Sequence, residues 1–148
     1  MQLTKHTDYA FRVLMYLATK PDGELSTIKE VTAAFDISRD HVMKIVQKLA
    51  KEGYINSIRG KQGGMKLGRN AADINLREIV TLMETTLEPV NCRETLCKIS
   101  SGCQLAGILF AAQELFMAHI EQYTLADLVM PNTETVHLIN TLLIEQLN

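Results

Sequence analysis

Apolar residues in the first fifty positions recur at helical spacing, and polar breaks separate three such runs. Residues 11–18 place apolar side chains on one face of a predicted helix that ends before the Pro21-Asp22-Gly23 break. Thr27 and Glu30 have the T-x-x-E pattern of a capping box, in which each side chain satisfies a backbone N–H that a helix start leaves free. A short second helix is therefore expected after Thr27, ending at Phe35.

A third helix is predicted between Ser38, which is a favourable N-cap residue, and Gly53, which ends it. Its apolar stripe consists of Val42, Ile45, Val46 and Leu49. The opposite face carries groups that can reach phosphates and base edges in a major groove: Arg39, His41, Lys44, Gln47, Lys48 and Lys51. The spacing predicts a helix-turn-helix with DNA contacts from Ser38, Arg39, His41, Lys44 and Lys48.

Two strand-like runs, residues 54–59 and 65–69, flank a glycine-rich turn after the third helix. Glycines let such a turn approach a DNA groove, and basic side chains neutralise phosphates. Alone, the hairpin would be read as an ordinary solvated turn. After a helix-turn-helix it predicts a wing, with DNA contacts from Arg59, Lys61, Gln62, Gly63 and Gly64.

The second half of the sequence predicts further helices. Asn75 and Glu78 repeat the capping pattern before a helix that contains residues 79–83. A long helix is expected from Leu105 to about Tyr123, with a stripe of Leu105, Ile108, Leu109, Ala112, Leu115, Phe116 and Ile120. Another cap is predicted at Thr124-Leu125-Ala126-Asp127, and a last helix from Thr133 to Leu147.

The chain offers no comparable partner helix for the long apolar stripe. The stripe would be buried most simply against the same helix of a second subunit, and a two-fold operator also requires a symmetric dimer. The alternative is that the long helix packs only on its own small N-terminal domain. We therefore expect a homodimer.

Charge divides the chain into unlike halves. Residues 1–70 contain 12 Lys and Arg against 7 Asp and Glu, whereas residues 71–148 contain 3 against 10. A basic module that faces nucleic acid, joined to an acidic part, gives this pattern. The expected fold is mainly α with a small β wing. Three regions are expected: a winged-helix DNA-binding domain (1–72), a connecting helix and cysteine segment (73–104), and a dimerisation helix with a C-terminal tail (105–148).

All three cysteines, Cys92, Cys97 and Cys103, lie within twelve positions. No apolar run is long enough to span a membrane and the N-terminus lacks the shape of a signal peptide, so a cytoplasmic protein without structural disulfides is expected. Three clustered thiols can hold a soft metal centre. Zinc is the plain alternative, although no fourth Cys or nearby His completes a zinc site, and incidental proximity of unpaired thiols also remains open.

Four stretches carry a family resemblance: MQLTKHTDYAFRVLMYLA, SRDHVMKIVQKLAKEGYINSIRGKQGGMKLG, the three-cysteine segment and YTLADLV. They resemble the NsrR-type repressors, nitric-oxide-sensing relatives of the iron–sulfur regulator IscR, and cover the chain to about Val129. The resemblance implies a dimeric winged-helix repressor that binds operator DNA through an iron–sulfur cluster and releases it when nitric oxide attacks that cluster. It favours a four-iron cluster over a two-iron cluster.

The resemblance also assigns residues. Cys92, Cys97 and Cys103 match the cluster ligands, and Asp8 matches the acidic fourth ligand, reaching the cluster of the other subunit. From the residues alone, Asp8 would be read as a helix cap or dipole partner. Asp40 stands where relatives are expected to have Asn, and its carboxylate would repel phosphate unless it points away from DNA.

Three other functions are alternatives to this one. A sensor of cluster supply, like IscR, shares the architecture and most motifs. A DNA-binding sensor based on zinc or on thiol oxidation would use the same three cysteines. An enzyme is not expected, because the sequence has no paired carboxylates in an identifiable cleft, no cysteine-histidine motif and no phosphate loop.

Overall fold

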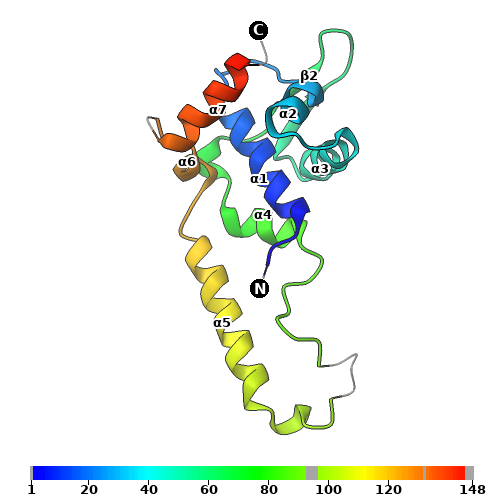
Figure 1. Ribbon diagram of the computed structural model, residues 1–148, viewed down its shortest axis with the longest axis vertical. Helices are drawn as coiled ribbons and strands as arrows, with labels where there is room; N and C mark the ends of the chain where they lie inside the picture. Colours follow the sequence, from blue (N-terminus) through cyan, green and yellow to red (C-terminus); the bar gives the residue numbers. More distant parts are fainter. Residues whose placement is uncertain (1, 93–96, 132, 146–148) are drawn as a thin grey trace.

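The computed structural model describes residues 2–92, 97–131 and 133–145 of the chain. It consists of a packed head and a projecting arm, with α5 (Gln104–Ile120) forming the arm together with residues 84–92 and 97–103, which precede it and include the short helical turn η2 (Ser100–Gly102) (Figure 1). The other elements belong to the head: α1 (Lys5–Ala18), α2 (Ile28–Phe35), α3 (Arg39–Lys51), β1 (Ile55–Ile58), β2 (Gly64–Leu67), η1 (Ala71–Asp73), α4 (Leu76–Met83), α6 (Leu125–Leu128) and α7 (Glu134–Glu145). The expectation of a mainly helical fold with a small wing is confirmed.

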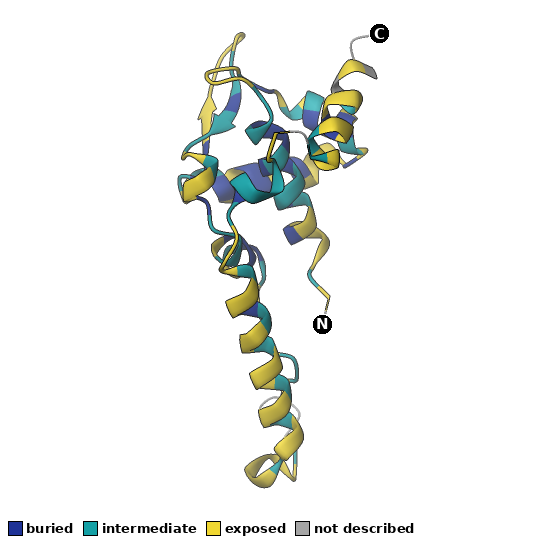
Figure 2. Cartoon of the chain, turned by 90° about the vertical axis from the view of Figure 1, so that its left-hand side faces the viewer, coloured by how far each residue is buried: buried dark blue, intermediate teal, exposed yellow. Residues whose placement is uncertain are grey.

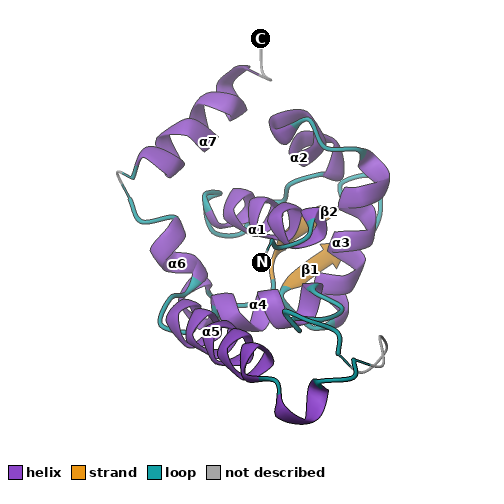
Figure 3. Cartoon of the chain, turned by 60° about the horizontal axis from the view of Figure 1, so that its bottom comes forward, coloured by secondary structure: helices purple, strands orange, loops and turns teal. Residues whose placement is uncertain are grey.

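Helix α1 is the centre of the head. Figure 3 shows it enclosed by α2, α3, α4 and α6, all of which contact it. Its apolar positions are therefore buried on most sides, and Val13, Leu14 and Tyr16 have no exposed surface. The helix predicted from the apolar spacing of residues 11–18 is confirmed, and it starts six residues earlier, at Lys5.

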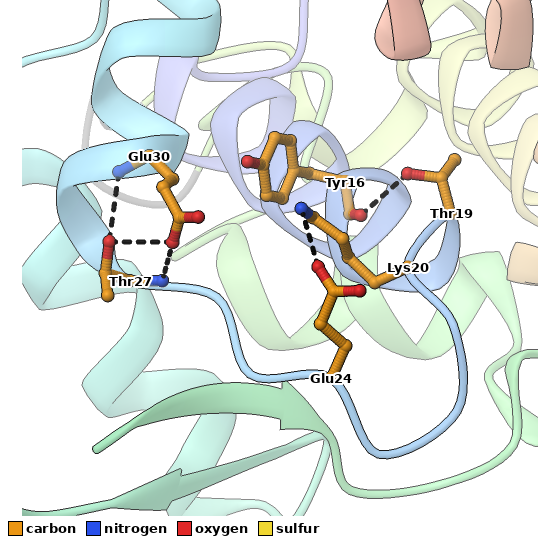
Figure 4. A network of polar contacts seen from close by, with 6 residues as sticks. All are labelled: Tyr16, Thr19, Lys20, Glu24, Thr27 and Glu30. Atoms are coloured by element: carbon orange, nitrogen blue, oxygen red, sulfur yellow. Dashed lines mark hydrogen bonds and ion pairs between the residues drawn. The ribbon is translucent and has the colours of Figure 1, made fainter. Parts of the chain in front are cut away.

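The helix-turn-helix follows the predicted caps closely. At the start of α2, the Thr27 backbone N–H donates to Glu30 Oε2 at 2.5 Å and the Glu30 N–H donates to Thr27 Oγ1 at 3.3 Å (Figure 4). Asp36 takes a left-handed conformation (φ 50°) that turns the chain, and Ser38 Oγ accepts the His41 N–H at the start of α3. Short polar side chains thus set where both helices begin.

Tyr16 lies beside Lys20 at the end of α1, with the Lys20 amine 5.3 Å from the ring centre (Figure 4). Its hydroxyl is buried and has no hydrogen-bond partner among the described residues. Burial, reinforced by the negative charges of Glu30 and Glu24, raises the pKa of Tyr16 to about 12. The phenol therefore stays neutral and acts as part of the core.

The wing is the antiparallel pair of β1 and β2, in which Ile55 lies opposite Leu67 and Ile58 opposite Gly64. Ser26 adds a short third ladder, since its backbone N–H and C=O pair with Met65 at 2.9 and 2.7 Å. The wing is therefore attached to the segment just before α2, and not only to α3.

One predicted capping box is wrong. Asn75 Oδ1 accepts the Arg77 N–H at 2.9 Å and so caps α4, but Glu78 does not complete the box. The Glu78 carboxylate instead accepts the Tyr54 hydroxyl at 3.0 Å and lies 3.9 Å from the Arg69 guanidinium. Partners that flank the wing, Tyr54 before β1 and Arg69 after β2, have displaced the local interaction.

Helix α5 ends at Ile120 and not at about Tyr123, as was expected. The Tyr123 carbonyl accepts the Leu76 N–H at 3.1 Å, and Thr124 bridges to Asn75, so the chain leaves the helix to attach to α4. An ion pair of 2.8 Å between Arg77 and Glu121 also fastens this end of the arm to the head.

The expected single stripe on α5 is too narrow a description. Apolar side chains lie around most of the helix, and Phe110 and Met117, which are outside the predicted stripe, belong to them. Met117 is the one buried residue that α5 contributes. Figure 2 shows the arm extending away from the head with most of its surface exposed.

Helix α7 confirms the last predicted helix as far as Glu145, while positions 146 and 147 of that prediction lie outside the described residues. It returns to the head and contacts α2, and Ile139 is buried in the same core as α1. None of the helices that the structure describes combines the length and apolarity needed to cross a lipid bilayer.

Candidate functional site

The outer face of α3 has the arrangement that DNA reading requires. Val42, Ile45, Val46 and Leu49 are buried, which fixes how the helix is rotated on the head. The polar side chains on the opposite face are all exposed: Arg39, His41, Lys44, Gln47, Lys48 and Lys51. Asp40 is exposed too, in the first turn, where the helix dipole favours a negative charge.

Two of the predicted DNA contacts interact with each other. Ser38 Oγ lies 2.9 Å from His41 Nδ1, so the cap of α3 and the imidazole are one hydrogen-bonded unit. The His41 ring also packs edge-on against His6 of α1, at 5.8 Å between ring centres, and against Tyr9 at 6.1 Å. The start of α3, the helix predicted to read DNA and called the reading helix below, is thus held in place by α1.

The wing places its predicted contacts at an exposed turn. Arg59, Lys61 and Gln62 are exposed between the two strands. Gly60 has φ +117°, and a Cβ at Gly63 would lie 2.2 Å from the Ile58 carbonyl oxygen. Glycine is therefore required by the turn itself, in addition to any approach to DNA.

The three cysteines lie on the arm. All are free and half-buried, and Cys103 is the residue from which α5 starts. The part of the chain that the structure describes contains no group of three or more His, Cys, Asp or Glu side chains placed to hold a metal ion. Residues 93–96, between Cys92 and Cys97, lie outside the described residues. The donor set, three thiols on one short segment, is nevertheless the soft set that iron–sulfur clusters use.

Asp8, the predicted fourth ligand, lies in the first turn of α1 and is exposed. Its carboxylate pairs with Arg12 through two contacts, 2.9 Å to Nη2 and 3.1 Å to Nε. The same guanidinium lies over the rings of Tyr9 and Phe35. Helix α1 and the far end of α5 are well separated in both Figures 1 and 2, so this structure does not bring Asp8 and Cys103 together within one chain.

Glu84 is a residue that the sequence analysis missed. It follows α4 at the point where the segment toward the cysteines begins, and its Oε1 accepts three hydrogen bonds from the start of α1. The donors are the Thr4 N–H (2.7 Å), the Thr4 hydroxyl (3.1 Å) and the buried Thr7 hydroxyl (2.5 Å). Burial opposes the charge, but these bonds outweigh it and lower the pKa of Glu84 below its usual value.

The chain is similar to known proteins in both family and fold. The family Rrf2, described as "Iron-dependent Transcriptional regulator", matches residues 3–131. CymR (YrzC), the global cysteine regulator of B. subtilis, shares 22% identity with this chain at a TM-score of 0.67, covering 90% of this chain and 99% of its own.

Two other solved structures are similar. The oxidized form of Staphylococcus aureus CymR shares 21% identity at a TM-score of 0.73, covering 90% of this chain and 99% of its own. T. potens IscR shares 19% identity at a TM-score of 0.70, covering 90% of each chain. At these identities, the likeness establishes the fold.

Proposed function

The chain belongs to the Rrf2 family of transcriptional regulators, which bind DNA and are not enzymes, and from this premise we propose a homodimeric repressor controlled by an iron–sulfur cluster that reacts with nitric oxide. The observation that carries the proposal is the combination of a basic reading helix and wing on the head with three thiols at the start of an uncovered apolar helix. The head supports operator binding, and the arm supports pairing and sensing.

A second copy of the chain is proposed to cover the arm. Leu105, Ile108 and Leu115 are 61%, 65% and 73% exposed, which is unusual for large apolar residues on one helix. Pairing two arms would bury them and would place two heads at a fixed separation. A spacing of about one helical turn of DNA, roughly 34–36 Å, is what two half-sites require.

The proposed cluster ligands are Cys92, Cys97 and Cys103 of one chain and Asp8 of the partner subunit. The separation of α1 from the far end of α5 within one chain supports a ligand that comes from the other copy. When bound, the cluster would supply iron that reacts with nitric oxide, and a four-iron form is favoured by the resemblance. The three thiolates would hold the cysteine segment in one shape, while Asp8 would attach that segment to the opposite head.

If the three cysteines and Asp8 were released from the cluster, the two heads would be free to move relative to each other. The cysteine segment continues into α5, and the base of α5 is fastened to α4 by Arg77 and Glu121. Asp8 would return to Arg12, the partner it has in this structure. The separation of the two reading helices would then no longer be enforced, and operator affinity would fall.

The first experiment measures iron, zinc and acid-labile sulfide in protein purified without oxygen, followed by a nitric oxide titration of duplex DNA binding. Iron with matching sulfide and loss of binding on titration are expected. Zinc, or no metal after attempted reconstitution, would remove the cluster from the proposal and leave a DNA-binding regulator.

Asp8→Ala tests the cross-subunit ligand. The variant should keep iron on its three thiolates but show a weakened link between nitric oxide and DNA release. Asp22→Ala, an exposed carboxylate on the turn after α1, is the matched control. A nitric oxide response of Asp8→Ala equal to that of the unsubstituted protein would rule out Asp8 as the transmitting ligand.

A second candidate is a thiol-based sensor without a cluster. It is favoured by the three free, half-buried thiols and by the fold shared with CymR, whose structure is known in an oxidized form. Colourless protein whose DNA binding responds to peroxide and is restored by a thiol reductant would favour it.

A further inference from the structure

Helix α7 (Glu134–Glu145) lies beyond residues 3–131, the part of the chain that matches the Rrf2 family. It carries neither the DNA-reading face nor the cysteines, so the function proposed above leaves it without a role. It nevertheless returns to the head and contacts α2, the first helix of the helix-turn-helix. In Figures 1 and 3, α2 lies between α7 and α3, so α7 packs on the side of α2 that faces away from the reading helix.

One face of α7 docks on the head. Ile139 is buried and belongs to the hydrophobic core, and Val136 and Leu142, three residues before and after it, are half-buried. Residues at this spacing lie on the same side of a helix. Leu138 and Ile144, in contrast, are exposed. The helix is therefore attached through the face that carries Ile139, the most deeply buried of these side chains.

The chain is held to the head on its way from the arm to α7. In α6, the Leu125 N–H donates to the Ile74 carbonyl at 2.8 Å, and α6 contacts α1 and η1. At the start of α7, the Thr133 hydroxyl donates to the Met130 carbonyl at 2.9 Å and accepts the Val136 N–H at 3.4 Å. Because α6 follows the end of α5, α7 provides a second connection between the arm and the helix-turn-helix, besides the one through α4 and α1.

Helix α2 is an element that needs such support. It has eight residues, and a helix this short depends on packing because its own hydrogen bonds stabilise it little. Its buried residues, Val31 and Ala34, are small, so little apolar area attaches it to α1 and α3. Burying one isoleucine changes an equilibrium constant by roughly tenfold to a hundredfold. The docking of α7 is therefore large enough to decide how often α2 opens.

We infer that α7 is a brace on the helix-turn-helix. By docking through Ile139 it keeps α2 closed on the core, and because α2 contacts α3 it lowers the free-energy cost of presenting the reading helix to DNA. Ile139 is then a positioning residue for operator binding, although it is buried and lies beyond the far side of α2. The consequence for DNA rests on the proposed function, whereas the effect of α7 on α2 depends only on contacts within the head.

Ile139→Asp tests the brace, because an unpaired charge at a buried site would detach the helix that carries it. Leu138→Asp is the matched control, with the same new charge at the adjacent, exposed position. Hydrogen exchange of the full-length protein, followed by NMR, compares the amides of α2 with those of α4, which packs on α1 and α5. Ile139→Asp should lower the protection of α2 about tenfold or more and leave α4 nearly unchanged. Leu138→Asp should match the unsubstituted protein.

Two milder variants separate a brace from a general loss of stability. Ile139→Ala keeps the site apolar but removes most of the buried side chain, and it should lower the protection of α2 more than that of α4. Ile139→Val keeps most of the buried area and should recover most of the protection of α2 and most of the DNA affinity.

The second arm measures binding to a duplex that the unsubstituted protein selects from a random-sequence pool. Ile139→Asp should weaken binding on the order of tenfold, with no change in the dimer dissociation constant measured by sedimentation velocity. The slope of log affinity against log KCl should stay the same, because the bound state keeps its phosphate contacts and only the cost of ordering α2 is added. Leu138→Asp should bind as the unsubstituted protein does.

Selective loss of α2 protection, together with weaker binding at an unchanged salt slope, supports the inference. Equal loss of protection from α2 and α4 in Ile139→Ala, no loss in any variant, a reduced salt slope, or loss from α2 without a change in binding would each overturn it. If the unsubstituted protein selects no duplex, the proposed function fails, and the exchange comparison still decides whether α7 braces α2.

Discussion

Helices α3 and α5 both carry enough apolar residues to be buried, but only α3 has its apolar face covered by its own chain. In α3, four apolar residues at helical spacing are buried against α1 and α2, and the remaining face is polar. In α5, which is longer, Met117 alone is buried although most of the helix is apolar. The head therefore completes its core with its own residues, whereas the arm has apolar surface that its own chain does not cover.

Because of this difference, the head is stabilised by folding within one chain, whereas the arm is stabilised by association between chains. Removing apolar area from water contributes about 25 cal/mol per Å², so the head gains its folding free energy within one chain. The arm can gain a comparable contribution only by association, and its contribution then depends on protein concentration. Substitutions on the two helices should consequently report on different equilibria.

The largest expected effect comes from charging the arm. Ile108→Glu combined with Leu115→Glu would place four carboxylates in the proposed interface of a dimer, and unpaired buried charges are strongly unfavourable. We expect the dissociation constant of the dimer to rise roughly a thousandfold or more, with loss of operator binding. Sedimentation velocity over a range of concentrations measures it.

Gln122→Glu, an exposed position beyond the end of α5, adds charge without entering the arm and serves as control. A double variant that remains dimeric at the concentration where the control is dimeric would show that α5 is not the interface.

A matched pair of leucine truncations should give a smaller and more selective effect. Leu49→Ala in α3 creates a cavity at a fully buried site and should lower the free energy of unfolding by about 2–5 kcal/mol. Leu115→Ala, at a site 73% exposed in one chain, should weaken dimerisation but leave the amide exchange protection of α1 nearly unchanged. Hydrogen exchange at one fixed protein concentration compares the two.

Equal loss of α1 protection in the two variants would contradict the distinction between head and arm. It would mean that the head depends on dimerisation for its own folding.

The head was largely predictable because its signals are local. Thr27 and Ser38 cap helices within three residues of themselves, and the stripe of α3 follows from period alone. Where a distant partner competes, the local signal fails. Glu78 was expected to cap with Asn75, but it binds Tyr54 and Arg69, whose positions become available only when the wing folds.

The arm, and the junction at which Glu84 meets the start of α1, were harder to predict because their partners are not local in the sequence. An apolar run predicts that α5 is buried, but it does not predict whether the same chain or another chain covers the helix. The single predicted stripe therefore does not describe the apolar surface of α5 fully. The outward face of α3 and the clustering of cysteines were visible in the sequence, whereas a cavity lined by the start of α2, the start of α3 and the wing forms only in the folded chain. Glu84 binds residues 77 and 80 positions away, and no sequence pattern marks that contact.

The smallest expected effect concerns this junction, where Glu84 joins the start of α1 to the root of the arm. Because its pKa is lower in the folded state, the charged carboxylate stabilises the fold above its unfolded pKa of about 4.3, and this contribution is lost as pH falls through the folded value. Glu84→Gln should therefore cost on the order of 1 kcal/mol at pH 7 and nearly nothing at low pH. Denaturant unfolding at a series of pH values measures both.

Glu88→Gln provides the comparison, since Glu88 is exposed on the same segment. If Glu84→Gln retained the same pH profile as Glu88→Gln, the three hydrogen bonds from Thr4 and Thr7 would not depend on the carboxylate charge, and the junction would be held by packing alone. A difference that is complete above the unfolded pKa and disappears as pH falls through the folded pKa instead identifies Glu84 as the charged link between the self-sufficient head and the arm.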